Sequence, residues 1–233
     1  MSNQIIFFTD MDDTIIQTKR KTDFSKEIEV GGYNKDGEES SFYYSGTKLF
    51  IDKLLEANIT LIPTTARSLN SYYRTTLSKD NRIKYAILNF GAMILVDNKI
   101  DTQWKEKIEK KLKSISLFSI SEDIINILDK SLTIKIIDDF YINIHNKVGL
   151  DNKSIKETLD NYLVNRDEFY LHHNDNSFAI LPKCINKSFA VEYMIDKLNP
   201  ILSLGAGDNR SDLDFMNITD FRVIPKKTSI NML

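Results

Sequence analysis

The amino-acid sequence predicts an α/β protein, with a doubly wound parallel sheet as its core and an inserted α+β cap. Short apolar runs rich in β-branched and aromatic residues indicate buried strands, and amphipathic helical patterns separate several of them. Such alternation is typical of a parallel sheet with helices on its faces. Between residues 96 and 181 the pattern changes to strands joined by very short turns, which indicates antiparallel pairing in a separate unit.

The predicted core elements lie on both sides of this inserted segment. The run Ile5-Ile6-Phe7-Phe8-Thr9 predicts the first buried strand. Apolar residues recur on one helical face over 48–57 and again after Lys187, which predicts two amphipathic helices. We therefore expect a discontinuous core of residues 1–95 and 182–233. Its further buried strands are expected at 60–64, 85–88, 201–204 and 221–224.

Two segments depart from the alternation of strands and helices. Residues 28–44 contain two strand-like runs around a turn near Gly37, which indicates a β-hairpin. Residues 96–181 combine helical patterns with four strand-like runs, as expected for an inserted α+β cap domain. The predicted cap helices pass through 104–115, 124–128 and 155–162, and the predicted cap strands cover 133–137, 140–145, 169–173 and 177–181.

The bulk composition narrows the range of functions. The 233 residues are 42% hydrophobic and 27% charged, as in ordinary soluble globular proteins. The net charge is −2, so basic residues are not in excess, and the composition does not favour nucleic acid or an anionic membrane as a partner. Cys184 is the only cysteine, so no disulfide can form within the chain. Residues 1–4 lack the basic stretch of a signal peptide, and no apolar run approaches the roughly 18 residues of a membrane span. We therefore expect a cytoplasmic protein.

A cluster of acidic residues follows the first predicted strand, in the stretch Asp10-Met11-Asp12-Asp13-Thr14. Ligands bind beyond the carboxyl ends of strands in open parallel sheets, so these carboxylates lie where a site is expected. An aspartate that attacks phosphorus needs a cation to mask its charge and a second acid to protonate the leaving oxygen. Asp12 has the spacing for that second acid, because alternate residues of an extended chain point to the same side. The alternative is a polar strand end followed by a turn.

Two further polar sites follow in the sequence. Thr65 and Arg67 come after the 60–64 strand, where a hydroxyl and a guanidinium group could bind a phosphoryl oxygen or another substrate anion. Thr65 or Ser68 could equally supply a helix N-cap. Lys187 lies at the start of a helix, where the helix dipole disfavours a cation unless carboxylates or a phosphate neutralise it. A solvated lysine is the alternative.

The last motif, Gly205-Ala206-Gly207-Asp208-Asn209-Arg210-Ser211-Asp212, again follows a strand and leads into a helix. Arg210 takes the place of the third glycine of a dinucleotide-binding fingerprint, so that function is not indicated. Asp208 and Asp212 instead add carboxylates to the same edge of the sheet. Two unit charges about 4 Å apart interact by roughly 4 kcal/mol at an effective dielectric constant of 20. The crowding of these carboxylates therefore predicts a bound cation.

The order of these motifs resembles that of the haloacid dehalogenase superfamily of phosphohydrolases, and the match spans essentially the whole chain. A cap between the second and third motifs resembles the subgroup with a large α/β cap on a Rossmann-like core, which includes Cof-like and sucrose-phosphatase-like enzymes. Asn89-Phe90-Gly91-Ala92 resembles the Asn-Gly-Ala stretch of that subgroup. The motifs that carry the resemblance are Asp10-x-Asp12-x-Thr14, Thr65, Lys187 and Gly207-Asp208-x-x-x-Asp212.

The resemblance implies a role for each matching residue. Asp10 would be the nucleophile and Asp12 the general acid and base. Thr65 and Lys187 would hold the phosphoryl group. Magnesium would be bound by the Asp10 carboxylate, the Asp12 main-chain carbonyl and Asp208. Asp212, with Asn209 beside it, would orient Lys187 or a metal-bound water.

The resemblance also implies a function, which is Mg²⁺-dependent hydrolysis of a small phosphorylated metabolite such as a sugar phosphate. A phosphosugar mutase of the same superfamily and a catalytically silent phospho-ligand-binding protein are the alternatives. Two positions depart from the family pattern and could reshape the substrate pocket: Ala66 replaces the glycine of the commoner Thr-Gly-Arg, and Phe90 replaces a usual glycine neighbour.

All three histidines lie in the predicted cap. Along 140–145 and 169–174 apolar residues alternate with polar ones, so each strand has one apolar and one polar face. His145 and His172 fall on the polar faces. We expect the apolar face to pack on the cap helices, and the polar face to close over Asp10 and contact the non-phosphate part of the substrate. A solvated sheet face is the alternative.

Overall fold

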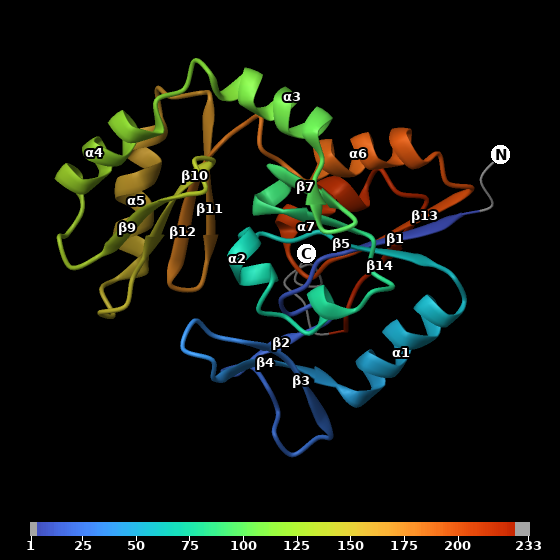
Figure 1. Ribbon diagram of the computed structural model, residues 1–233. Coiled ribbons are helices and arrows are strands. Elements are labelled where there is room, and N and C mark those ends of the chain that lie inside the picture. The colour runs from blue at the N-terminus through green and yellow to red at the C-terminus, as the bar shows by residue number, and fades with distance from the viewer. Residues whose placement is uncertain (1–3, 227–233) are drawn as a thin grey trace. The chain divides into compact units, whose positions relative to one another are not determined.

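The structure, a computed structural model, describes residues 4–226 and divides the chain into two compact units (Figure 1). The described residues up to Lys105 and from Asn186 onward form the core unit, and Glu106–Ile185 form the inserted unit. The sequence places these boundaries at 95/96 and 181/182, within ten residues of the divisions in the structure. Residues 1–3, part of the expectation about a signal peptide, lie outside the described residues.

A four-stranded parallel sheet forms the centre of the core unit. Its strand order is β14 (Phe221–Val223), β13 (Leu202–Ala206), β1 (Ile5–Thr9) and β5 (Thr60–Pro63). β1 lies between two partners, which is why its sequence is apolar on both faces and its last four residues are buried. The sequence predicts a buried strand at 221–224, but the three residues of β14 are exposed, and β14 lies at the edge of the sheet.

Helices cover the two faces of this sheet, as predicted. The helix α1 (Ser45–Glu56) buries Ile51 and Leu55 in a cluster with Phe7 and Leu61, on one face of the sheet. The helix α6 (Lys187–Leu198) buries Ala190, Val191 and Met194, and Figure 1 shows it on the face opposite α1. The short elements α2 (Leu69–Tyr72), η1 (Leu77–Lys79), η2 (Asn89–Gly91) and α7 (Arg210–Met216) complete the helical part of the core unit.

The predicted strand at 85–88 exists, but it does not belong to the parallel sheet. It is β6 (Tyr85–Leu88), and it pairs antiparallel with β7 (Met93–Val96), which pairs with β8 (Lys99–Ile100). β6 lies beside the end of β5, where an isolated parallel bridge joins Thr64 and Ile87. The tight turn η2 reverses the chain directly after β6 and so supplies this antiparallel partner.

The predicted hairpin is also present, with one additional strand. The strands β3 (Ile28–Tyr33) and β4 (Glu39–Tyr44) pair antiparallel, and β2 (Gln17–Thr18) pairs with the other side of β4. The turn contains Gly37 at a φ of 83°, a left-handed conformation that favours glycine. This three-stranded sheet follows the acidic motif directly along the chain.

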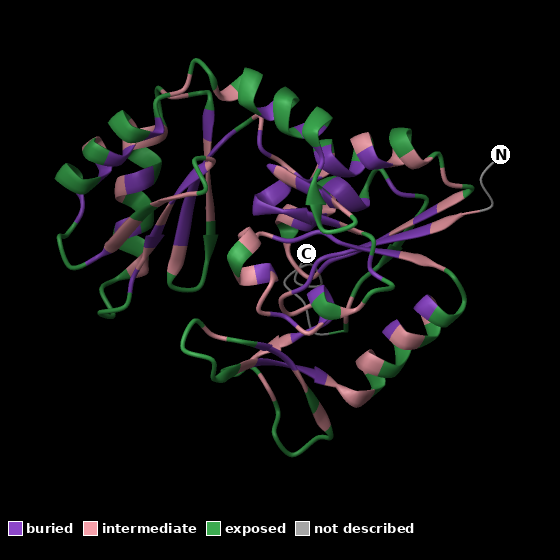
Figure 2. Ribbon diagram, viewed as in Figure 1, coloured by how far each residue is buried: buried purple, intermediate pink, exposed green. Residues whose placement is uncertain are grey.

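The inserted unit is an α+β unit, as predicted. Its antiparallel sheet has the order β11 (Phe169–Asn174), β12 (Ser177–Pro182), β10 (Tyr141–His145) and β9 (Thr133–Ile137). The apolar residues of these strands form a cluster with those of α4 (Leu117–Ile127) and α5 (Asn152–Leu163), and Figure 2 shows the buried residues along the strands. The helix α3 (Thr102–Leu112) crosses the boundary from the core unit.

Within residues 4–226, none of the helices has both the length and the apolar character needed to cross a membrane. The cytoplasmic location remains a prediction from the sequence.

Candidate active site

The candidate site lies at the carboxyl end of the parallel sheet. Asp10 follows β1 directly, and its main-chain N–H donates to the carbonyl oxygen of Ala206 at 2.8 Å. Asp208 follows β13, the neighbour of β1 on one side, and Thr65 follows β5, the neighbour on the other side. The pairing of these three strands therefore determines which motifs meet, as expected for parallel strands.

The chain turns sharply after Asp10 and brings Thr14 back toward the carboxylates. Asp13 has a φ of 65°, and the N–H groups of Ile15 and Ile16 both donate to the Met11 carbonyl at 3.0 Å. The Thr14 hydroxyl lies 3.2 Å from Asp10 Oδ2 and 3.3 Å from Asp208 Oδ1. Thr14 therefore links the first and fourth motifs.

Lys187 is buried between two aspartates. Its Nζ donates to Asp10 Oδ1 and to Asp212 Oδ1, at 2.7 Å in each case. Burial disfavours the charge on the Lys187 ammonium group, but the two carboxylates outweigh burial and raise its pKa. Removal of any one of these groups would leave a buried charge without its partner, which is strongly destabilising. This arrangement explains how a lysine is accommodated at the first residue of α6.

The carboxyl groups of Asp10 and Asp208 have pKa values above their ordinary range. Burial raises the pKa of Asp10 to about 8, Lys187 opposes this shift, and the neighbouring Asp212 adds to it. Burial and the negative charge of Asp212 and Asp13 also raise the pKa of Asp208 to about 6. Carboxyl groups with raised pKa values that converge in this way are typical of functional sites.

The guanidinium group of Arg67 forms an ion pair with the carboxylate of Asp12. Its Nε donates to Asp12 Oδ2 at 2.8 Å, and one terminal guanidinium nitrogen donates to Oδ1 at 2.6 Å. The side chain of Arg67 is 15% exposed and that of Asp12 is 31% exposed, so the pair lies at the rim of the buried cluster. A bidentate pair of this kind is one of the stronger side-chain interactions. The sequence alone did not indicate that Arg67 pairs with Asp12.

The turn η2 supports two sides of the site through its main chain. The N–H groups of Asn89 and Phe90 donate to the carbonyl oxygens of Arg67 and Thr65, at 2.9 and 3.1 Å. Gly91 has a φ of 99°, and a Cβ there would lie 2.3 Å from the Asn186 carbonyl oxygen. Only glycine allows this approach. The Asn-Phe-Gly stretch therefore holds the second motif and the start of α6 in place.

The last motif uses glycine for a similar reason. A Cβ on Gly207 would lie 2.3 Å from the Cβ of Asp212. The Asn209 N–H donates to Asp212 Oδ2 at 3.1 Å, while Asp212 Oδ1 accepts from Lys187. The start of α7 therefore orients the Asp212 carboxylate toward Lys187.

The donor set fits a hard divalent cation. Oxygen atoms of Asp10, Asp208 and Asp212 all lie within 4.8 Å of one another. Magnesium prefers carboxylate, carbonyl and water oxygens. Both oxygens of the Asp212 carboxylate already accept hydrogen bonds, one from Lys187 and one from the Asn209 N–H. Asp10 and Asp208 are therefore the carboxylates better placed to bind a metal. Asp12 offers its main-chain carbonyl as well, because its side chain is occupied by Arg67.

The structure brings the predicted site residues of the core unit together. Asp10, Asp12, Arg67, Lys187, Asp208, Asn209 and Asp212 form the contacts described above. Thr65 is buried at the end of β5, and its hydroxyl accepts from the Arg67 N–H at 3.2 Å. His145 and His172 lie on β10 and β11 of the inserted unit. Thr14 was part of the motif but had no predicted role, although its spacing after Asp10 across a turn was a usable signal.

Comparisons with known proteins identify the family of the chain. Residues 3–225 match the family described as sucrose-6F-phosphate phosphohydrolase. The sucrose-phosphatase of Synechocystis sp., solved with sucrose and phosphate, is 15% identical with a TM-score of 0.66, and the match covers 100% of this chain and 86% of that one. The C-terminal domain of Candida albicans trehalose-6-phosphate phosphatase is 13% identical with a TM-score of 0.64, over 93% and 73% of the two chains.

A haloacid dehalogenase-like hydrolase from Bacteroides thetaiotaomicron is 10% identical with a TM-score of 0.53, over 96% and 94% of the two chains. At these identities the solved structures show a common fold. No curated protein sequence matches the chain. The family match extends over almost the whole chain. The chain therefore belongs to the sucrose-6F-phosphate phosphohydrolase family and is a phosphatase of the haloacid dehalogenase type.

Proposed function

We propose that this phosphatase hydrolyses the phosphate monoester of a small sugar, with Asp10 as the nucleophile and Mg²⁺ as the cofactor. The observation that carries the proposal is the contact of Lys187 Nζ with Asp10 Oδ1, next to Asp208 and Thr14. Lys187 and Thr14 leave the Asp10 carboxylate with a restricted orientation, and preorganisation of this kind is a requirement for an attacking group. Lys187 can also neutralise an incoming phosphoryl oxygen.

The reaction needs two steps at the same phosphorus atom. In the first, a carboxylate oxygen of Asp10 forms a bond to phosphorus, the bond to the sugar oxygen breaks, and Asp12 gives its proton to that oxygen. In the second, water attacks the aspartyl phosphate, Asp12 takes a proton from the water, and the bond between phosphorus and Asp10 breaks. Asp10 is regenerated and inorganic phosphate leaves.

The ion pair with Arg67 limits when Asp12 can act. Arg67 occupies both carboxylate oxygens of Asp12, so this acid cannot reach a leaving group while the pair lasts. The phosphoryl group of a substrate is an alternative anionic partner for Arg67. We infer that substrate binding draws Arg67 away from Asp12, which becomes free to exchange a proton. This would reconcile the predicted contact of Arg67 with the substrate and the pair seen in the structure.

The carboxylates of Asp10 and Asp208 and the main-chain carbonyl of Asp12 are the ligands we propose for Mg²⁺. When bound, the ion would reduce the repulsion among the carboxylates and withdraw charge from the phosphoryl oxygens. Thr14 would keep the Asp10 and Asp208 carboxylates adjacent, since its hydroxyl contacts both.

The substrate class is inferred from the family. The matching family is described by its action on a sugar phosphate, and two of the similar structures are a sucrose-phosphatase and a trehalose-6-phosphate phosphatase. We therefore propose a phosphorylated sugar or disaccharide as the substrate, with no nucleic acid or membrane partner.

The test is the release of inorganic phosphate from a panel of sugar phosphates, nucleotides and p-nitrophenyl phosphate, with Mg²⁺ and with a chelator. We expect Mg²⁺-dependent release, with kcat/KM for at least one sugar phosphate about tenfold or more above that for every nucleotide. Conversion of the sugar phosphate into an isomer without release of phosphate would indicate a mutase. Absence of turnover with every compound would indicate a silent binding protein.

A further inference from the structure

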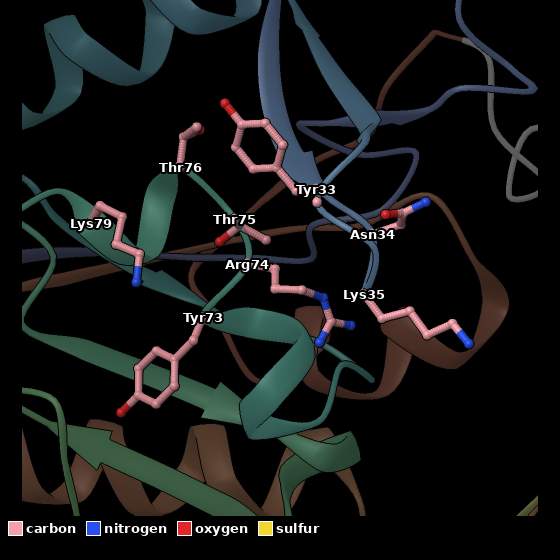
Figure 3. A pocket seen from close by; sticks show the side chains of 9 residues that line it. Tyr33, Asn34, Lys35, Tyr73, Arg74, Thr75, Thr76 and Lys79 are labelled. Carbon is pink, nitrogen blue, oxygen red and sulfur yellow. The ribbon is translucent and has the colours of Figure 1, made fainter.

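One cavity of the core unit is lined by residues that take no part in the proposed reaction. It lies between the turn that joins β3 to β4 and the segment that follows α2, and its volume is about 280 Å³. Figure 3 shows Lys35 and Tyr33 on the side of the turn, and Arg74, Tyr73 and Lys79 on the other side. Pockets for drug-sized ligands start at about 300 Å³, so this cavity suits a small metabolite.

The charges around this cavity are all positive. Lys35, Arg74 and Lys79 line it, and none of the described lining residues is acidic. Within residues 4–226, none of these three cations forms an ion pair. Glu38 lies in the adjoining turn, but its carboxylate accepts from the Asn34 side chain at 2.9 Å. Three cations without acidic partners around one hollow create a local positive potential that favours an anion.

Arg74 has donor capacity that the protein does not use. One of its terminal nitrogens donates to the Asn70 carbonyl at 3.0 Å, which fixes the position of the guanidinium group. Its Nε is enclosed and has no hydrogen-bond partner among the described residues. An enclosed donor without a partner is costly, and an anionic ligand would satisfy it.

The walls of the cavity are joined by main-chain hydrogen bonds. The Tyr33 N–H donates to the Arg74 carbonyl at 3.0 Å, and the Thr76 N–H donates to the Gly31 carbonyl at 3.0 Å. A Cβ on Gly32 would lie 2.9 Å from the Ser41 hydroxyl and 3.2 Å from the Arg74 carbonyl, so glycine permits this close approach. The cavity therefore exists before a ligand binds, which lowers the cost of binding.

Two tyrosine rings provide apolar surface beside the cations. Tyr33 is 41% exposed, and the Tyr73 ring has Lys79 Nζ at 5.7 Å from its centroid. Aromatic rings with a polar hydroxyl are suited to the mixed apolar and polar surface of a sugar or a similar ring. The cavity thus combines a cationic part with an aromatic part.

We propose that this cavity binds a small phosphorylated molecule at a site separate from Asp10. A phosphate group carries up to about two negative charges near neutral pH, which matches several cations better than a single carboxylate does. The guanidinium group of Arg74 would donate to the phosphate oxygens, and Lys35 and Lys79 would neutralise the remaining charge. The tyrosines would contact the organic part of the molecule.

The test is an NMR titration of the full-length, isotope-labelled protein with inorganic phosphate and, separately, with glucose 6-phosphate, both without Mg²⁺ and with a chelator. We expect the amide signals of residues 33–37 and 73–79 to shift and saturate. Arg74→Gln should weaken this binding about fivefold or more, because hydrogen bonds to charged groups are the stronger ones. Lys153→Gln, which removes an exposed cation from the inserted unit, should leave binding unchanged.

Further variants keep the test decisive. If Arg74→Gln does not fold, the double variant Lys35→Gln/Lys79→Gln, which changes two exposed side chains, should weaken binding to a similar extent. Tyr33→Ala should reduce the affinity for glucose 6-phosphate but not for inorganic phosphate. The proposal is overturned if the signals of these two segments do not shift, or if Arg74→Gln responds like the unmodified protein. Shifts near Asp10 and Thr65 report on the catalytic site and test the proposed function separately.

Discussion

The polar groups of the core unit and those of the inserted unit are held in very different ways. In the core unit, buried side chains from distant parts of the chain contact one another: Lys187 binds Asp10 across 177 positions of sequence. In the inserted unit, the polar side chains of the sheet are more accessible, and a contact such as the bond from the Ser177 hydroxyl to Asn143 joins neighbouring strands. Figure 2 shows the same contrast in burial between β1 and the outer part of β11.

This difference indicates how each unit responds to substitution. A buried charge that loses its partner costs several kcal/mol, since water cannot replace the partner. A partly exposed polar side chain loses little, because water can take over its hydrogen bonds. We therefore expect substitutions of Asp10 and Asp12 to have the largest effects, substitution of Asp208 a smaller one, and substitutions on the sheet of the inserted unit the smallest.

The largest effect is expected for Asp10. Asp10→Asn removes the attacking carboxylate oxygen, because an amide does not form the covalent aspartyl phosphate, and kcat should fall by more than about 10⁴-fold. Asp12→Asn keeps the main-chain carbonyl and the nucleophile but loses the proton transfer, which is worth about 10²- to 10⁴-fold. With p-nitrophenyl phosphate, whose leaving group needs little protonation, the Asp12→Asn protein should accumulate a phosphorylated form.

Acid-quenched mass spectrometry measures this accumulation directly. A phosphate adduct is expected on the peptide that contains Asp10 in the Asp12→Asn protein, and no adduct in Asp10→Asn. Circular dichroism controls for folding in both variants. An adduct on another residue, or turnover by Asp10→Asn near the unmodified rate, would contradict the proposed mechanism.

The elements that carry these residues were predictable because their signals are local. The run from Ile5 to Thr9 and the apolar face of α6 are recognisable from a few neighbouring residues, and both were predicted. The edge position of β14 and the antiparallel partner of β6 depend on how the rest of the chain packs. The sequence therefore predicts a buried strand at 221–224 where the structure has an exposed one, and it gives no indication of the antiparallel partner of β6.

The site shows the same limit. The sequence pattern predicted Asp10, Lys187 and the last motif as site residues because their order resembles that of a known family, and the structure places them in contact. It did not indicate that Arg67 pairs with Asp12, since these residues are 55 positions apart and Arg67 could contact either a substrate or a carboxylate. Nor did it explain Phe90, whose φ of 57° results from a turn that follows β6.

A smaller effect is expected at the proposed metal site. Magnesium at about 100 times its Kd should stabilise the protein by about 2.7 kcal/mol, because the ion binds the folded state alone. For a chain of this size the shift in Tm should be about 5 to 10 °C. Asp208→Asn should remove most of this shift, while Asp214→Asn, an exposed residue of α7, should keep it. Thermal unfolding of each variant with Mg²⁺ and with a chelator measures the shift in Tm. The same Tm under both conditions for the unmodified protein would argue against the metal site.

The smallest effect is expected on the sheet of the inserted unit, where the three histidines provide an internal comparison. Alternate residues of β10 and β11 face opposite sides, and Ile144 and Leu171 join the cluster with α4 and α5. His145 and His172 therefore lie on the face away from these helices. His173 lies on the other face, with its ring stacked on Phe178 at 4.2 Å between centroids.

If the face with His145 and His172 contacts the sugar part of the substrate, alanine at either position removes about one hydrogen bond. The KM for the sugar phosphate should rise about threefold to tenfold, which corresponds to the usual 0.5–1.5 kcal/mol per bond. The KM for p-nitrophenyl phosphate should stay within about twofold, since that compound has no sugar hydroxyl groups to recognise. His173→Ala is the matched control and should change neither value. Steady-state kinetics of the three variants with both compounds distinguishes the outcomes: equal effects on the two substrates, or an effect of His173→Ala as large as that of His172→Ala, would mean that this face is merely solvated.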